Sequence, residues 1–138
     1  MIMKYLQLDP ESKLPDISGL KPFRSVVIID ENVSSEWQTL ASTWLVKSGC
    51  LYMMAWGKEC STWDNSVDYA NIAEFNYGDI PEENFVMTTW HEDEPLKEVF
   101  WFAKHNAFHP VVELPNILIL HISSYNKENE LLLEYANA

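Results

Sequence analysis

The sequence is poor in several residue types, and each shortage excludes a class of protein. Lysine and arginine together number 9 against 21 acidic residues, which gives the 138-residue chain a formal net charge of -12. This charge has the wrong sign for neutralising nucleic-acid phosphates and for adhering to anionic lipid surfaces. We therefore expect no nucleic-acid partner and no membrane partner.

Long apolar runs, glycine and arginine are also scarce. No apolar run approaches the roughly 20 residues of a membrane-spanning helix, and the first residues lack the features of a secretory signal. The stretch 30–34, which follows the first strongly apolar run, has no glycine, so a dinucleotide fingerprint and a phosphate-binding loop are both excluded. Arg24 is the only arginine, so there is no guanidinium cluster to clamp phosphates. We expect no cofactor.

Cysteine and histidine are too few, or too badly spaced, for a disulfide or a zinc site. Cys50 and Cys60 are the only cysteines, and they flank one predicted strand about 25 Å apart, whereas a disulfide needs Cα atoms within about 7 Å. Two free thiols indicate a cytoplasmic protein. His105 and His109 have helical spacing, but zinc needs three or four ligands, so no metal site is predicted.

What the sequence does contain is a regular alternation of two patterns. Apolar, β-branched runs typical of buried strands occupy residues 25–30, 50–56, 85–90 and 116–122. Amphipathic segments typical of helices separate these runs. Strands joined in this way pair in parallel, so the pattern predicts a three-layer α/β domain. We expect a mainly parallel sheet of four to five strands, with the flavodoxin-like (Rossmann-like) order 2-1-3-4.

The two ends of this single predicted domain, residues 1–138, are less regular than its βαβαβαβ core at 25–122. Three prolines make residues 1–24 a largely irregular segment, in which Lys4 to Leu8 could form a short edge strand. Residues 123–138 form a C-terminal extension. Within it, 130–135 fits either an antiparallel strand or a last helical turn.

A ligand site in such a sheet lies beyond the carboxyl ends of its strands, where the strand order reverses. With the order 2-1-3-4, the crevice would fall between the first and third strands. Its residues would be Asp30, Trp56, Trp90, His91, Glu92 and Asp93. An enzyme would use Asp30 as an orienting carboxylate, His91 as a base and His121 as a further candidate. Alternatively, these strand ends are merely polar, and the acids at 92–94 complement a helix N-terminus.

The third predicted helix has an unusual outer face. Its core side carries Leu96, Val99, Phe100, Ala103 and Ala107. Trp101, His105 and Phe108 fall about 120 to 180 degrees away from Leu96, where a helix covering a sheet is normally polar. A terminal segment could cover this aromatic stripe. Otherwise the stripe, together with Glu98, is a candidate surface for a partner or for a homodimer.

A small, strongly acidic domain without a catalytic motif resembles immunity proteins, which neutralise toxin nucleases. The resemblance is one of type, with no alignable motif, so no residue role can be transferred. It implies a non-catalytic protein that occludes a basic protein partner, whose encounter the negative field would accelerate. Two alternatives remain open: a small α/β enzyme or ligand sensor that uses the crevice, and an accessory subunit with a homomeric interface.

Overall fold

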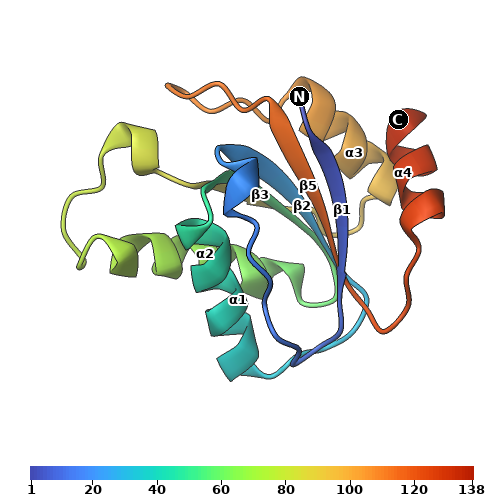
Figure 1. Ribbon diagram of the computed structural model, residues 1–138, viewed down its shortest axis with the longest axis horizontal. Coiled ribbons are helices and arrows are strands. Elements are labelled where there is room, and N and C mark those ends of the chain that lie inside the picture. Colours follow the sequence, from blue (N-terminus) through green and yellow to red (C-terminus); the bar gives the residue numbers. More distant parts are fainter.

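The computed structural model describes residues 1–138 and has one five-stranded sheet covered by helices on both faces (Figure 1). The strands are β1 (Met3–Leu8), β2 (Phe23–Ile29), β3 (Cys50–Gly57), β4 (Met87–Trp90) and β5 (Asn116–Ile122). The helices are α1 (Ser35–Lys47), α2 (Cys60–Glu74), α3 (Leu96–His105) and α4 (Glu128–Ala136). All neighbouring strands pair in parallel, so the predicted α/β class and parallel sheet are confirmed.

The predicted strand order is wrong, because β3 and β4 are both added on the same side of β2 before the chain returns to the other side. The order is β1-β5-β2-β3-β4, so β2, β3 and β4 are consecutive neighbours. Helix α3 then carries the chain back across β3 and β2, and β5 joins the sheet on the free side of β2. Buried parallel strands share one apolar pattern whatever their neighbours, so their sequences did not reveal this order.

Strand β5 lies in the interior of the sheet, between β1 and β2, and forms part of the core. Its four residues from Ile117 to Leu120, together with Ile122, have no exposed surface. They belong to a single cluster of 34 buried apolar residues that includes both faces of the sheet. The continuous apolar run at 116–122 follows from this burial on two faces.

Helices α1 and α2 cover one face of the sheet, and α3 and α4 cover the other (Figure 1). The connection between β1 and β2 runs along α1. The Trp37 indole donates to the Ser12 carbonyl over 2.8 Å, and the Trp44 indole donates to the Pro15 carbonyl over 2.6 Å. The edge strand considered for Lys4 to Leu8 is present as β1 (Met3–Leu8). Residues 9–22, in which only Ser18–Leu20 form a short 3-10 turn, are held against α1 by these contacts.

Local details of the helices follow the sequence closely. The N-cap of α1 is Ser34, whose hydroxyl accepts from the Trp37 N–H over 3.1 Å. The predicted core side of α3, from Leu96 to Ala107, is buried as expected. The open alternative near the C-terminus resolves as helix, because α4 spans Glu128–Ala136 and buries Leu131 and Tyr135.

Two further expectations concern the thiols and the membrane. Cys50 and Cys60 are both free, as the spacing predicted, and both are buried. None of the helices combines the length with the apolar character that crossing a bilayer requires.

Candidate functional site

The two ends of the parallel strands carry very different charges. We call the side of the sheet where the strands end the carboxyl edge, and the side where they begin the opposite edge. Within four residues after the strand ends, the chain places one lysine, Lys58, and eight acids: Asp9, Glu11, Asp30, Glu31, Glu59, Glu92, Asp93 and Glu94. The four residues before each strand include only Glu83, Glu113, Lys21 and Lys47 as charged side chains. Each helix also begins at the carboxyl edge, and four N-termini offset roughly two of these negative charges. A strong negative field remains at the carboxyl edge.

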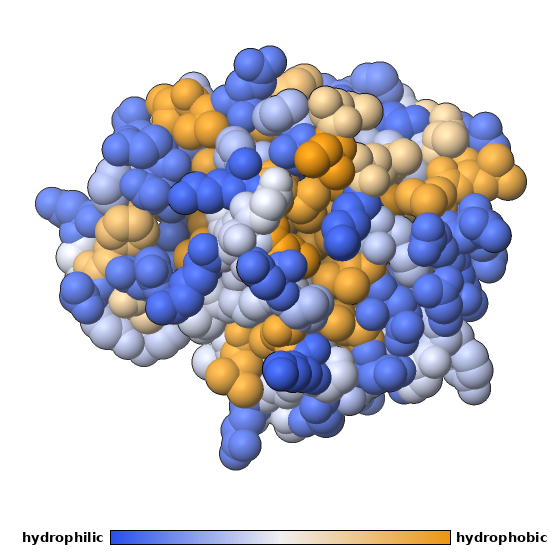
Figure 2. Space-filling view, viewed as in Figure 1, coloured by the Kyte–Doolittle hydropathy of each residue, from blue (hydrophilic) through white to orange (hydrophobic).

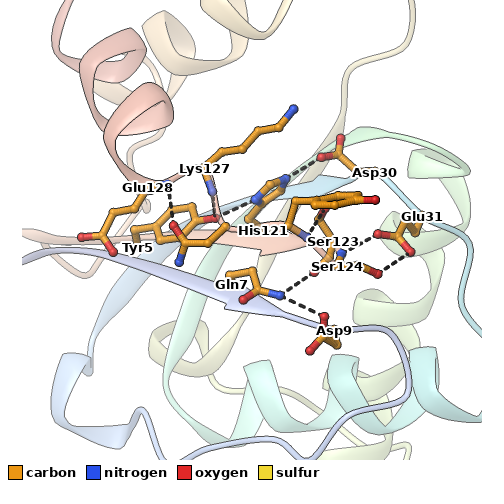
Figure 3. Close-up of polar contacts among 12 residues, drawn as sticks. Tyr5, Gln7, Asp9, Asp30, Glu31, His121, Ser123, Ser124, Lys127 and Glu128 are labelled. Atoms are coloured by element: carbon orange, nitrogen blue, oxygen red, sulfur yellow. Dashed lines mark hydrogen bonds and ion pairs between the residues drawn. The ribbon is translucent and has the colours of Figure 1, made fainter.

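The strand order reverses between β2 and β5, and a polar cluster around the buried His121 occupies that position. His121 lies on β5, opposite Ile28 of β2 and Gln7 of β1, and only 1% of it is exposed. Its Nε2 lies 2.5 Å from Asp30 Oδ2, and its Nδ1 lies 2.7 Å from the Tyr5 hydroxyl (Figure 3). Both imidazole nitrogens therefore have partners inside the protein.

The hydrogen bonds of this cluster have a consistent direction. The Lys127 N–H donates to the Tyr5 oxygen over 3.0 Å, so the Tyr5 O–H is free to donate to His121 Nδ1. His121 then carries its proton on Nε2 and donates it to the Asp30 carboxylate. Burial raises the pKa of Tyr5, which keeps its hydroxyl protonated in this arrangement.

Neighbouring polar contacts tie the end of β5 to the strands on either side. The Ser124 N–H and hydroxyl both donate to the Glu31 carboxylate, and the backbone N–H holds the pKa of that carboxyl below its usual value. On the other side, the Gln7 amide donates to the Ser123 carbonyl over 2.6 Å and to Asp9 over 3.1 Å (Figure 3). The cluster closes the centre of the carboxyl edge, where a ligand crevice would be expected.

The observed strand order separates Asp30 from His91, which the predicted order placed on two sides of one crevice. Asp30 follows β2 and His91 follows β4, and β3 lies between those two strands. Two strand spacings separate the residues by about 10 Å. The structure instead pairs Asp30 with His121 and places His91 in a separate hollow.

That hollow has a volume of about 400 Å³ and opens where β3 and β4 end. It is lined by Trp56, Gly57, Glu59, Cys60, Ser61, His91, Glu92, Asp93 and Glu94. Four of these residues are acidic and none is a lysine or arginine. We call it the acidic hollow. Trp90, the other predicted crevice residue, is half exposed at the end of β4 and does not line it.

His91 forms one wall of the acidic hollow and is itself fixed by two hydrogen bonds. Its Nδ1 lies 2.8 Å from Glu94 Oε2, and its Nε2 lies 2.9 Å from the Thr89 hydroxyl. The neutral tautomer that fits donates from Nδ1 and accepts at Nε2. The ring also packs edge-on against Phe102 at 5.2 Å. No ring nitrogen is left to act as a base on a ligand.

The backbone around the acidic hollow adopts left-handed conformations that side chains disfavour. Glu59 has φ 54° and Asp93 has φ 59°. Gly57 has φ 106°, and a Cβ there would lie 2.3 Å from the Ile29 carbonyl oxygen, so only glycine fits. Such strain gathers at binding and active sites more than elsewhere. Here it holds two carboxylate side chains at the rim.

Cys60 begins α2 beneath this rim and is not arranged as a nucleophile. Burial raises the pKa of its thiol, the His91 backbone N–H opposes that rise, and the charge of Glu92 adds to it. The thiol is therefore protonated at neutral pH. No three His, Cys, Asp or Glu side chains are grouped closely enough to hold a metal ion.

The aromatic stripe of α3 lies in the open. The rings of Trp101 and His105 contact each other at a tilt of 46° with their centres 4.9 Å apart, and Trp101 is 46% exposed. Glu98 is exposed on the same helix, while Phe108 lies beyond its end, 65% exposed, in another hollow. No terminal segment covers the stripe, so that alternative is excluded.

Sequence reasoning missed Tyr5, Glu59 and Cys60 as members of these clusters. Tyr5 and Gln7 alternate on β1, and that period could have marked one polar face of an edge strand. Glu59 and Cys60 directly follow the β3 end that was already considered. They lie close to His91 because β3 pairs with β4, and the predicted strand order did not place these two strands side by side.

Comparison with known proteins identifies the family and nothing closer. No curated protein and no solved structure matches the chain. The family model "Domain of unknown function (DUF7684)" matches residues 3–138, which is nearly the whole chain. The protein with this closed histidine cluster and this acidic hollow therefore belongs to the DUF7684 family.

Proposed function

We propose that this protein binds a basic protein partner through the carboxyl edge of its sheet and acts by occluding that partner, without catalysis. The observation that carries the proposal is the acidic hollow, where Glu59, Glu92, Asp93 and Glu94 surround an opening without any basic residue. A lysine or arginine side chain entering it would meet carboxylates on several sides, and arginine binds a carboxylate through two parallel hydrogen bonds.

None of the acids of the carboxyl edge forms an ion pair with a lysine or an arginine. The structure has one lysine–carboxylate ion pair, Lys47–Glu74 at 3.5 Å, and it lies at the opposite edge. The charge at the carboxyl edge is therefore not neutralised by intramolecular lysine or arginine. A field of this kind accelerates encounter with a cationic surface and makes the rate sensitive to salt.

Aromatic side chains beside the acids supply apolar contact. Trp56 lines the acidic hollow and is held by its indole N–H, which donates to the Glu94 carbonyl over 2.7 Å. Trp90 is half exposed at the end of the adjacent strand. Tryptophan is enriched among the residues that dominate interface energies, and its ring face attracts cations.

The internal hydrogen bonds of both histidines support a role without catalysis. His121 and His91 each use both ring nitrogens internally, and Cys60 is a buried thiol with a raised pKa. A toxin nuclease fits as the partner, because nucleases present basic surfaces to phosphates. The two free thiols support a cytoplasmic location.

The exposed stripe on α3 favours a second candidate, a homodimer or partner contact through Trp101 and His105. Light scattering of the wild type and Trp101→Ala tests the homodimer. A dimeric mass that becomes monomeric on substitution supports it, and a monomeric wild type contradicts it.

Affinity capture from the native source tests the main proposal, with three baits compared at low salt. The first is the wild type. The second carries Glu92→Gln, Asp93→Asn and Glu94→Gln, which remove charge but keep side-chain shape, and asparagine tolerates the left-handed φ at 93. The third is a charge-matched control from the exposed loop before β4: Asp79→Asn, Glu82→Gln and Glu83→Gln.

We expect the wild type and the control bait to recover the same basic protein, and the carboxyl-edge bait to lose it. Two results would overturn the proposal: recovery of no basic partner by the wild type at low salt, or equal recovery by all three baits.

A further inference from the structure

A hollow of a different kind opens at the opposite edge of the sheet. It has a volume of about 500 Å³ and lies between the end of α3 and the segment that leads to β5. Arg24 from β2 and Lys104 from α3 line it together with apolar side chains that include Met1, Phe108 and Val111. Figure 2 shows apolar atoms near the N-terminus, one of several apolar patches on this face, and Met1, Ile2 and Met3 are exposed.

Arg24 is the most unusual residue of this hollow. It is the only arginine in a chain with 21 acidic residues, yet it forms an ion pair with none of them. Its Nε atom is buried and has no hydrogen-bond partner. A buried donor without an acceptor is costly, and a guanidinium group offers five donors in a fork that matches a carboxylate.

Lys104 places a second cation beside the first. Its ammonium donates to the carbonyls of Ala136 over 3.3 Å and Ala138 over 3.1 Å, and it lies 4.8 Å from the centre of the Tyr135 ring. These contacts fix the ammonium and leave one of its three N–H groups free. Burial raises the pKa of Tyr135, and the charge of Arg24 and a hydrogen bond from the Arg24 side chain oppose that rise, so that it is the Nε atom of Arg24 that lacks a partner.

The apolar wall of the hollow is held in place by a buried histidine. His109 Nε2 lies 2.8 Å from the Phe85 carbonyl, and its Nδ1 accepts from the N–H groups of Val111 over 3.2 Å and Val112 over 3.1 Å. This tautomer fixes the loop on both sides of Pro110. The hollow is therefore preformed, as small-molecule sites usually are, and its volume lies in their usual range.

We infer that this hollow binds a monocarboxylate with a short apolar chain. The carboxylate would accept from Arg24 and Lys104, which supplies the counter-charge that Arg24 lacks. The apolar chain would lie against Phe108 and Val111. The only acid that lines the hollow, Glu113, is exposed and forms no ion pair with either cation, so it does not occupy that position.

Titration of the full chain with hexanoate, followed by amide chemical shifts, tests this inference. We expect shifts to concentrate at Arg24, Lys104 and the non-proline residues of 107–114, with hexanol causing none of them. Arg24→Met should weaken hexanoate binding about tenfold or more, because hydrogen bonds to charged groups are lost. Lys47→Met is the matched control, since it removes an exposed charge at the same edge but outside the hollow, and it should leave binding unchanged.

If Arg24→Met fails to fold, Phe108→Ala serves as the second test. Phe108 is exposed, so its replacement should not disturb folding. It should weaken hexanoate more than acetate. An acetylated dipeptide ending in a free leucine carboxylate identifies the source: tighter binding than hexanoate indicates a peptide C-terminus, and weaker binding a free acid. The inference is overturned if hexanol binds as well as hexanoate, if Lys47→Met costs as much as Arg24→Met, or if the shifts map elsewhere.

Discussion

Two histidines at the carboxyl edge of the sheet share a bonding pattern and differ in their surroundings. His121 and His91 each contact a carboxylate with one ring nitrogen and a hydroxyl with the other. His121 lies in the middle of the sheet, between β1 and β2, and its partners close the position where the strand order reverses. His91 lies beside the edge strand β4, where the same pattern forms the wall of an open hollow. Position in the sheet, not residue type, separates a closed cluster from the wall of an open hollow.

The largest expected effect concerns the closed cluster. His121→Ala leaves the Tyr5 hydroxyl and the Asp30 carboxylate without their partner and creates a cavity beside β5. We expect the free energy of unfolding to fall by about 3 kcal/mol or more, measured by urea denaturation. His91→Ala should cost at least about 1 kcal/mol less, because its partners Glu94 and Thr89 can turn to water. Equal losses for the two variants would contradict the comparison.

A smaller effect concerns pH. The Ser124 N–H lowers the pKa of Glu31, so the folded state favours the ionised carboxylate. This stabilisation is complete above the pKa of the unfolded carboxyl and is lost as the pH falls through the lower folded pKa. Glu31→Gln should therefore lose less stability than the wild type between pH 6 and pH 3, as read from urea midpoints. The exposed-loop variant Glu113→Gln should behave like the wild type. If Glu31→Gln lost as much stability between pH 6 and pH 3 as the wild type does, this role of Glu31 would be refuted.

The smallest effect reports the field inside the acidic hollow. The charge of Glu92 adds to the raised pKa of the Cys60 thiol, so Glu92→Gln should increase the thiolate fraction. We expect labelling of Cys60 by a thiol reagent at pH 8 to accelerate about twofold, the size of a surface charge interaction. Peptide mass analysis separates this site from Cys50, whose pKa burial raises to about 11 and which should stay unlabelled. A rate unchanged by Glu92→Gln, or changed as much by Glu82→Gln, would argue against such a field.

The sequence was sufficient to predict the elements but not their neighbours. The run at 116–122 was predicted with its observed bounds, because a strand buried on both faces is apolar throughout. The same property makes β5 and β2 interchangeable by pattern. Without the correct strand order, Asp30 was predicted to share a crevice with His91. Its observed partner is His121, which was already a candidate site residue.

The N-terminal segment shows a second limit of pattern reading. Prolines at 10, 15 and 22 correctly predicted breaks, but the contacts that order residues 9–22 come from Trp37 and Trp44 of α1. Such contacts join positions 25 to 29 residues apart, and local propensity does not encode them. The position of Trp101 on the outer face of α3 was predicted, in contrast, because a helical wheel depends on local spacing alone. Whether a terminal segment covers it could not be read from the sequence, and the structure shows it exposed.

The central claim is that the carboxyl edge, and not total charge, recognises a basic partner. Its most direct test is the association rate of the captured partner, measured from 20 to 500 mM salt with the wild type, the triple variant at 92–94 and the matched triple variant at 79, 82 and 83. The account predicts that the wild type and the matched variant slow steeply with salt, and that the carboxyl-edge variant is about tenfold slower at low salt with a shallower dependence. Identical slopes for the two triple variants would show that only net charge matters and would contradict the account.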